Sequence, residues 1–233
     1  MIKILVTGAG GGLGQGLIKS LKLINDLPLR IIAADMSELA AGLYTGDSAY
    51  LVDRCDSPNY MKSLDKVFTA ENIDYYFPGT DLELLFCSKN KNRILNDYGV
   101  KTVISSQEAV DISNDKFKTY AFLKKNNFNH PKTVYFKDFQ EDMGFNYPLI
   151  VKPAIGCRSI GVHKIINKKE LLRHKEFKEE SYIVQELIGD DDSEYTCTVV
   201  KMNNSLISPV LPLKRELRSG DTFRATPVKS KLI

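Results

Sequence analysis

The stretch that decides the fold runs from Tyr147 to Val162 and reads Y-P-L-I-V-K-P-A-I-G-C-R-S-I-G-V. It predicts an apolar strand ending at Lys152, a loop containing Gly156, Ser159 and Gly161, and a second strand. A lysine beside such a loop suits a polyphosphate, because glycines let backbone N–H groups approach the oxygens and the lysine supplies a compact positive charge. The order of residues differs from a Walker A loop, in which the lysine follows the glycines. A β-hairpin with a glycine turn and a surface lysine would explain the same residues.

A downstream segment, S-Y-I-V-Q-E-L-I-G-D-D-D-S-E-Y-T, favours the phosphate-binding interpretation. It predicts a strand from Tyr182 to Gln185, an acidic turn, and a further strand opened by Glu194. The order strand, lysine, glycine loop, strand, helix and strand with Q-E-x-x-G resembles the ATP-grasp superfamily. Its branch of carbamoyl-phosphate-synthase-like and pyrrolysine-biosynthesis-type ligases is the most similar. The resemblance extends from Ile2 to about Pro227.

The resemblance implies a role for each residue of a nucleotide site. Lys152 would reach the α- and β-phosphates, and Lys116 would lean over them from the start of a helix. The loop from Gly156 to Gly161 would close over the phosphates, with Arg158 at a place where glycine is frequent. A helix capped by Asn114 or Ser113, with a solvated lysine, is the alternative for Lys116. The residues assigned to nucleotide binding are Lys116, Lys152, Gly156, Ser159, Gly161, Gln185, Glu186, Leu187, Ile188 and Glu194.

The Q-E-L-I segment is expected to form the hinge between two ATP-grasp subdomains. Adenine would lie there on apolar side chains, with backbone groups near Glu186 and Ile188 reading its edge. Glu194 would lie near the ribose or the floor of the active site. The run Asp190 to Asp192 is expected to be a solvated turn, with Asp192 as a weaker ribose candidate. The preceding F-N-H-P-K-T-V segment, Phe128 to Val134, matches the family by position and is assigned no chemistry.

A basic cluster follows two further expected strands, Thr196 to Val200 and Leu206 to Leu213. It surrounds Ser219-Gly220-Asp221 and comprises Lys214, Arg215, Arg218 and Arg224. In the family this region faces the acceptor substrate and the γ-phosphate, so Arg215 is the catalytic candidate. A solvated surface charge is the alternative.

The first part of the chain predicts alternating strands and helices, and therefore an α/β, Rossmann-like parallel sheet domain. The expected strands are Ile2–Val6, Ile31–Ala34, Tyr50–Val52, Tyr75–Phe77 and Val100–Ile104, and the clearest helices are Tyr60–Ala70 and Leu82–Tyr98. We expect this domain to span residues 1–112. The resemblance then implies an ATP-grasp A subdomain over 113–185 and part of a B subdomain over 186–233, together an incomplete α+β ATP-grasp domain.

Two patterns favour a different class, an NAD(P)-dependent short-chain dehydrogenase or epimerase. Gly8, Gly10 and Gly14 approximate a dinucleotide fingerprint, and Asp35 ends the next strand, where a ribose would be held. Glycines are also needed for any tight turn between a strand and a helix. Tyr120 and Lys124 have Y-x-x-x-K spacing on an expected helix, Asn114 to Lys125, which also makes an ordinary amphipathic face.

Thr80, Asp81 and Glu83 follow the fourth strand, at the sheet edge where ligands bind. They could shape a substrate site, or Thr80 or Asp81 could cap the following helix.

The resemblance also implies Mg²⁺, held by acidic residues on a later strand pair. No E-[IV]-N-x-R segment occurs in the sequence, so we expect these ligands to lie beyond Ile233 in a longer protein. The chain alone is then expected to be truncated, with little ligase activity. In the complete enzyme, ATP would phosphorylate a small-molecule carboxylate, and an amine would displace the phosphate. An inactive nucleotide-binding module is the third class.

Composition excludes several other functions. The net charge of +3 is too small to indicate a nucleic-acid or anionic-membrane partner. The four cysteines are far apart in sequence and no signal peptide is evident, so we expect reduced thiols and a cytoplasmic protein. A homodimer is compatible with the resemblance.

Overall fold

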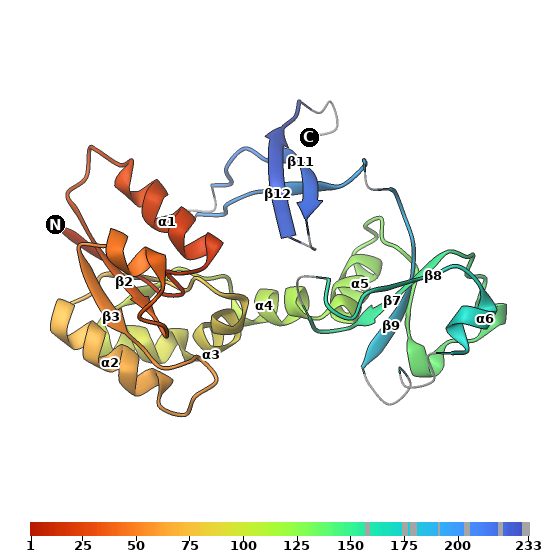
Figure 1. Ribbon diagram of the computed structural model, residues 1–233, viewed down its shortest axis with the longest axis horizontal. Coiled ribbons are helices and arrows are strands. Elements are labelled where there is room, and N and C mark those ends of the chain that lie inside the picture. The colour runs from red at the N-terminus through yellow and green to blue at the C-terminus, as the bar shows by residue number, and fades with distance from the viewer. Residues whose placement is uncertain are drawn as a thin grey trace. The chain divides into compact units, whose positions relative to one another are not determined.

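The computed structural model describes residues 1–156, 159–173, 177, 181–190, 192–202, 206–218 and 221–229. Arg158, Asp191, Ser219 and Gly220, which were considered above, lie outside the described residues. The chain divides into two compact units, Met1–Asp111 and Ile112–Ile233 (Figure 1).

The first unit contains the expected parallel sheet. Its strands are β1 (Ile2–Val6), β2 (Leu29–Asp35), β3 (Ser48–Leu51), β4 (Tyr75–Phe77) and β5 (Lys101–Thr102). They lie in the order β3-β2-β1-β4-β5, and every pair is parallel. This order places the first strand at the centre and builds outward in both directions, as in one half of a doubly wound fold. The prediction of a Rossmann-like sheet is confirmed.

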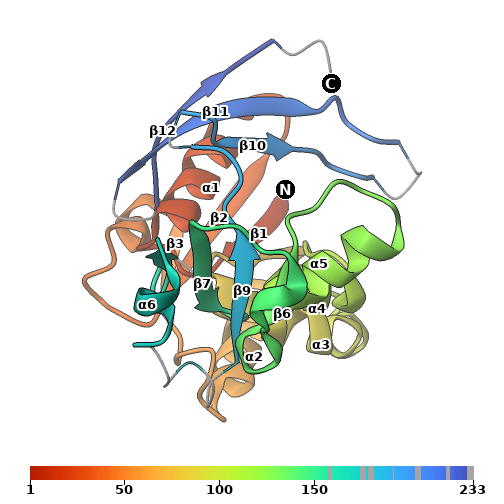
Figure 2. The same cartoon turned by 90° about the vertical axis from the view of Figure 1, so that its right-hand side faces the viewer.

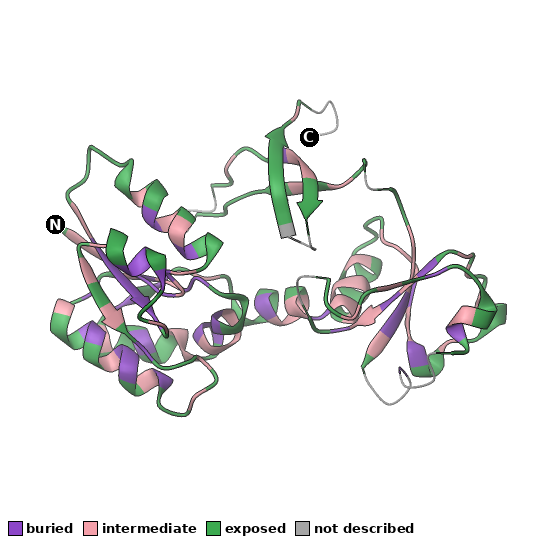
Figure 3. Ribbon diagram, in the orientation of Figure 1, coloured by how far each residue is buried: buried purple, intermediate pink, exposed green. Residues whose placement is uncertain are grey.

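Helices cover both faces of this sheet because its strands are apolar on both sides. Leu5 of β1 packs in one core with α2 (Tyr60–Glu71) and α3 (Asp81–Tyr98). Ile4 and Val6 point the other way, into a second core with α1 (Gly12–Lys22) and the 3-10 turn η1 (Ala41–Thr45). Figure 3 shows the buried residues concentrated along these strands and the inner sides of the helices.

The second unit opens with a four-stranded antiparallel sheet in the order β6-β9-β7-β8 (Figure 2). The helices and strands of this part of the second unit are α5 (Lys116–Lys125), β6 (Thr133–Tyr135), η2 (Phe136–Asp138), η3 (Glu141–Met143), β7 (Leu149–Pro153), β8 (His163–Ile165), α6 (Lys168–Leu171) and β9 (Tyr182–Glu186). One face of the sheet carries a core that includes Leu149, Val151 and Val184. The opposite face therefore presents the alternate residues of β7 and β9.

Several expected boundaries differ from the structure, and three of these differences lie beyond residue 106. The helix expected over Asn114 to Lys125 is α5, which begins at Lys116; Asn114 instead ends a separate helix, α4 (Gln107–Asn114), and Asp115 lies between the two. The return strand expected over Leu206 to Leu213 begins only at Leu211, as β11 (Leu211–Arg218). The strand expected over Thr196 to Val200 is β10 (Tyr195–Thr198).

β10, β11 and β12 (Asp221–Pro227) form a separate antiparallel sheet. Figure 3 shows β12 as largely exposed and β11 as partly exposed. None of the described helices is both long and apolar enough to cross a membrane.

Candidate active site

Lys152 lies near the end of β7 and is partly buried. Its Nζ donates a hydrogen bond to the Gln185 Oε1 at 2.7 Å. Burial lowers the pKa of Lys152, and the nearby positive charge of Lys116 lowers it further. Two cations held this close favour an anionic ligand, because the ligand would relieve their repulsion.

Lys116, the first residue of α5, reaches the glycine loop that follows β7. Its Nζ donates to the Gly156 carbonyl at 2.9 Å, and its backbone N–H donates to the Ala154 carbonyl at 2.8 Å. Asp115 pairs with Ile155 in an isolated β-bridge. The start of α5 is thus joined to the segment between Lys152 and the loop.

The N-cap of α5 is Asp115, which corrects the expectation of Asn114 or Ser113. The Asp115 Oδ1 accepts from the backbone N–H groups of Phe117 at 2.8 Å and Lys118 at 3.2 Å. A carboxylate here satisfies the orphan donors of the first turn and complements the helix dipole. Because the cap precedes Lys116 directly, it fixes where the Lys116 side chain leaves the helix.

The far end of the glycine loop makes a tight turn. The Val162 N–H donates to the Ser159 carbonyl at 3.3 Å, and Ser159 and Gly161 have φ of 55° and 71°. A Cβ on Gly161 would lie 2.9 Å from the Tyr182 hydroxyl and 3.0 Å from the Pro153 ring. Both left-handed φ and close packing therefore require glycine at this position.

The expected hinge is partly strand. Gln185 and Glu186 end β9, while Leu187 and the exposed Ile188 follow it. The Glu186 N–H donates to the Lys132 carbonyl at 3.0 Å, and the Lys132 N–H donates to the Glu186 carboxylate at 2.8 Å. The carboxylate occupies the place that the Glu186 backbone carbonyl would take in a regular antiparallel pair. The ladder therefore ends at Glu186.

Glu194 and Arg215, which were assigned to different roles, pair with each other. The Arg215 Nη1 lies 3.2 Å from the Glu194 Oε1, and the Arg215 N–H donates to the Glu194 carbonyl at 2.9 Å. The Arg215 Nε also donates to the Thr222 Oγ1 at 2.8 Å. Arg215 and Lys214 thus belong to β11 rather than to a connecting loop.

The acidic segment after the hinge is a turn, as expected. The Asp190 Oδ1 accepts from the Asp192 N–H at 3.1 Å, and the Ser193 N–H donates to the Asp190 carbonyl at 3.1 Å. These groups are exposed, and the Asp190 carboxylate serves the backbone of its own turn.

In the glycine turn of the first unit, groups that would bind a dinucleotide make hydrogen bonds within the protein. Asp35 accepts from the Gly10 N–H at 2.8 Å through Oδ2 and from the Ser37 N–H at 3.0 Å through Oδ1. The Gly11 N–H donates to the Gly8 carbonyl at 3.0 Å. The carboxylate and these two loop N–H groups, which would hold ribose and pyrophosphate, are therefore already paired.

Close packing explains the glycines of this turn. A Cβ on Gly14 would lie 2.3 Å from the Gly8 carbonyl oxygen. Two glycines elsewhere in the unit meet the same turn, since a Cβ on Gly42 would lie 1.9 Å from the Ala9 oxygen and one on Gly79 2.0 Å from the Thr7 oxygen. These contacts account for the fingerprint-like spacing without a cofactor.

The other dehydrogenase pattern is also explained locally. The Lys124 Nζ donates to the Tyr120 hydroxyl at 3.3 Å within α5. Both residues belong to the second unit, whereas the glycine turn belongs to the first. The structure therefore gives no support to the dehydrogenase interpretation.

Glu83 is buried within the first unit, whereas Thr80 is exposed at the start of the following helix. Thr80 is the N-cap of α3, its hydroxyl accepting from the Glu83 N–H at 3.3 Å, while Asp81 is exposed. The buried Glu83 carboxylate accepts from Gly79 N–H at 3.0 Å, the Thr80 hydroxyl at 2.9 Å and the Tyr60 hydroxyl at 2.5 Å. The motif is a variant of the capping box.

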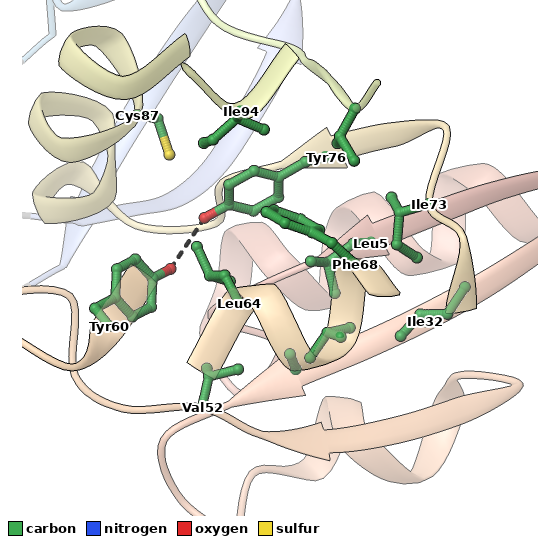
Figure 4. Close-up of a cluster of buried hydrophobic side chains, with 13 residues drawn as sticks. Leu5, Ile32, Val52, Tyr60, Leu64, Phe68, Ile73, Tyr76, Cys87 and Ile94 are labelled. Carbon is green, nitrogen blue, oxygen red and sulfur yellow. Dashed lines mark hydrogen bonds between the residues drawn. The ribbon is translucent and has the colours of Figure 1, made fainter. Parts of the chain in front are cut away.

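Tyr60 and Tyr76 extend this network into the core. Their hydroxyls point toward each other at 3.0 Å (Figure 4), and the Tyr76 hydroxyl lies 3.4 Å from Glu83. Burial raises the pKa of both tyrosines, and it raises the pKa of the neighbouring Cys87 thiol to about 12. Cys87 is thus an unreactive core residue at neutral pH.

Models of two protein families match the chain. Residues 4–103 match the N-terminal domain of PylC-like proteins, and residues 113–209 match the ATP-grasp domain. Residues 113–209 form an ATP-grasp domain.

Two individual proteins are similar to the chain in sequence. An uncharacterized MG011 homolog from Mycoplasma pneumoniae is 28% identical over 135 residues, covering 58% of this chain and 43% of that protein. The carbamoyl phosphate synthase large chain of a Thermoanaerobacter species is 24% identical over 250 residues, covering 98% of this chain and 22% of that protein.

A solved structure has the same ATP-grasp fold. The N5-carboxyaminoimidazole synthetase of Staphylococcus aureus, complexed with ADP, superposes with a TM-score of 0.70 at 20% identity, covering 96% of this chain and 57% of that one. The chain thus spans less than half the length of the two similar proteins and 57% of the solved structure.

The described part of this ATP-grasp chain holds no cluster of three or more His, Cys, Asp or Glu side chains suited to a metal ion.

The sequence analysis missed one residue of the candidate site, Thr133, whose hydroxyl accepts from the Gln185 Nε2 at 2.8 Å. The only signal for it was the Pro-Lys-Thr pattern, to which no chemistry was assigned.

Proposed function

We propose that this chain carries the nucleotide-binding part of an ATP-dependent ligase, which activates a carboxylate as an acyl phosphate for attack by an amine. The observation that carries the proposal is the convergence of Lys152, Lys116 and Gly156. Lys116 touches the Gly156 carbonyl, and its charge lowers the pKa of Lys152. Two cations beside a glycine loop suit the α- and β-phosphates of a nucleotide.

In the proposed reaction, a carboxylate oxygen of the substrate attacks the γ-phosphorus. The bond from phosphorus to the β,γ-bridging oxygen breaks, and ADP leaves. The amine nitrogen then attacks the acyl carbon, the carbon–oxygen bond to phosphate breaks, and the amine loses a proton to solvent. Lys152, Lys116 and the loop at Gly156, Ser159 and Gly161 would hold the triphosphate in line, so their contribution is positioning and charge stabilisation.

The end of β9 is the proposed adenine contact. The Glu186 side chain already accepts the Lys132 N–H. Its backbone carbonyl is thereby spared for the exocyclic amine of adenine. Gln185, Leu187 and the exposed Ile188 would complete this contact, with Ile188 offering apolar surface to the base.

Arg215 and Glu194 are proposed to act as a pair. The Arg215 side chain is 25% exposed, and its Nη1 lies 3.2 Å from the Glu194 carboxylate. A transferring phosphoryl group would draw Arg215 away from this partner, while the released Glu194 could accept from a ribose hydroxyl. When bound, Mg²⁺ would neutralise phosphate charge, as in other phosphoryl-transfer enzymes.

Ligand-dependent thermal unfolding of the full chain tests nucleotide binding. We expect Mg-ATP and ADP to stabilise the chain by about 1.4 kcal/mol when present at tenfold their Kd. The stabilisation should disappear in Lys152→Ala and persist in Lys164→Ala, which removes an exposed lysine from the adjacent strand β8. Stabilisation by NADP⁺ alone, or by no nucleotide, would contradict the proposal.

An inactive nucleotide-binding module would pass the binding test, so turnover needs its own measurement. ADP release by the chain with mixed carboxylates and amines is that measurement, and release would favour the ligase over the inactive module.

A further inference from the structure

Three polar side chains connect neighbouring strands on one face of the β6-β9-β7-β8 sheet. The Lys152 Nζ donates to the Gln185 Oε1 at 2.7 Å, and the Gln185 Nε2 donates to the Thr133 Oγ1 at 2.8 Å. The Thr133 hydroxyl donates to the Pro131 carbonyl at 2.9 Å. The chain of hydrogen bonds thus runs from the proposed phosphate-binding lysine to the backbone preceding β6.

The chemistry of the donors fixes the direction of this series of hydrogen bonds. An ammonium group has no acceptor, so the Gln185 side chain must turn its oxygen toward Lys152. Its NH₂ group then faces Thr133, whose oxygen accepts while its single proton goes to Pro131. A flipped amide would oppose two donors at Lys152, so the ammonium fixes which way round the Gln185 amide lies, and the bond to Thr133 then holds the side chain in place.

Strand register places the three residues together. Thr133 is directly opposite Gln185 across β6 and β9, and Gln185 is opposite Ile150 across β9 and β7. Lys152 is two residues beyond Ile150, so it lies on the same face and diagonal to Gln185. The core residues Val151 and Val184 occupy the opposite face. On the hydrogen-bonded face, Thr133 and Ile183 are buried, whereas Lys152 and Gln185 remain partly exposed.

We propose that Gln185 and Thr133 are positioning residues that hold the Lys152 ammonium for the nucleotide phosphates, an inference that rests on the proposed function. A free lysine has many rotamers, and a held ammonium loses less entropy when a ligand binds. One of its three protons is used by Gln185, which leaves two for phosphate oxygens. The partner is a neutral amide, so the positive charge stays uncompensated until an anion arrives. Burial and Lys116, which lower the pKa of Lys152, agree with such a cation.

Calorimetric titration of the full chain with Mg-ADP tests the inference through matched variants. We expect Thr133→Val to weaken binding about 3- to 10-fold, the range of one lost hydrogen bond, and Thr133→Ser to restore it. Gln185→Glu should weaken binding further, because a carboxylate would neutralise Lys152. In a Lys152→Ala background, Thr133→Val should change the affinity less than twofold, since the two residues act through one contact.

The outcomes separate the two proposals. If Lys152→Ala binds as tightly as the wild type, the proposed nucleotide site itself is wrong. If Lys152→Ala loses affinity while Thr133→Val does not, only the positioning inference is wrong. An equal loss from Thr133→Val in both backgrounds would also overturn it, because a general structural defect needs no Lys152. Thr133→Ser keeps the hydroxyl and covers the case in which Thr133→Val folds poorly.

Discussion

Replacing Glu83 with leucine should lower the free energy of unfolding of the first unit by a large fraction. The buried carboxylate accepts from Gly79 N–H, the Thr80 hydroxyl and the hydroxyls of Tyr60 and Tyr76. After the substitution, Thr80 is exposed and can bond to water, and the two tyrosines, 3.0 Å apart, can share one hydrogen bond. Two buried donors remain unpaired, namely Gly79 N–H and one tyrosine hydroxyl.

Each buried unpaired donor costs about 1–3 kcal/mol, so the expected loss is roughly 2–6 kcal/mol. Domains of this kind have only about 5–15 kcal/mol of stability in total. Glu83→Gln should lose less, because its amide oxygen can accept from Gly79 while its NH₂ group donates to a tyrosine hydroxyl. Glu108→Leu, at an exposed position of α4, is the matched control and should cost less than about 1 kcal/mol.

Hydrogen exchange followed by mass spectrometry measures this loss in one unit at a time. Peptides from β4 and α3 should lose protection by about 30-fold or more in Glu83→Leu. Peptides from β7 and β9 belong to the second unit and serve as the internal control. A loss of less than about fivefold in β4 and α3, about 1 kcal/mol, would refute the argument that unpaired donors dominate the effect.

Two further outcomes follow from the cores of the units. Burial raises the pKa of Tyr60 and Tyr76. Above pH 10 these two tyrosines ionise in the unfolded chain but keep their protons in the folded chain, so the free energy of unfolding should fall as pH rises. Urea midpoints measured from pH 8 to 11 should fall less steeply in Tyr60→Phe. Leu149→Ala should cost the second unit about 2–5 kcal/mol, because Leu149 is fully buried, whereas Leu172→Ala, at a position 58% exposed, should cost under about 1 kcal/mol by the same urea titration. Similar midpoints for the two alanine variants would contradict the assigned core.

The parallel sheet could be predicted because its signal is local. Ile2–Val6 and Ile31–Ala34 are short apolar runs between helical segments, and the handedness of βαβ crossovers leaves few topologies. The boundary at Asp115 was missed for a local reason as well. Aspartate favours both a helix N-terminus and a turn, and the preceding Q-E-A-V-D-I-S-N segment is too short for a clear period.

The site shows where sequence reasoning ends. The resemblance pointed to Lys116 and Lys152, because both stand in recognisable motifs. The bond from Gln185 to Thr133 joins residues far apart in sequence and depends on the register of β6 against β9. Likewise, whether Asp35 faces a ribose or the Gly10 N–H is decided by where the end of β2 meets the turn, which spacing alone does not give.

The glycine turn of the first unit bears on protein engineering. A cofactor phosphate introduced there would compete with Asp35 for the Gly10 N–H and would meet a like charge. Asp35→Asn would remove the charge and leave the crowding, because Gly42 and Gly79 allow neighbouring loops to press against the backbone oxygens of Ala9 and Thr7. Redesign toward a dinucleotide would therefore have to rebuild three loops together. In this chain the turn is closely packed against neighbouring loops, so new ligand specificity is more readily engineered around Lys152.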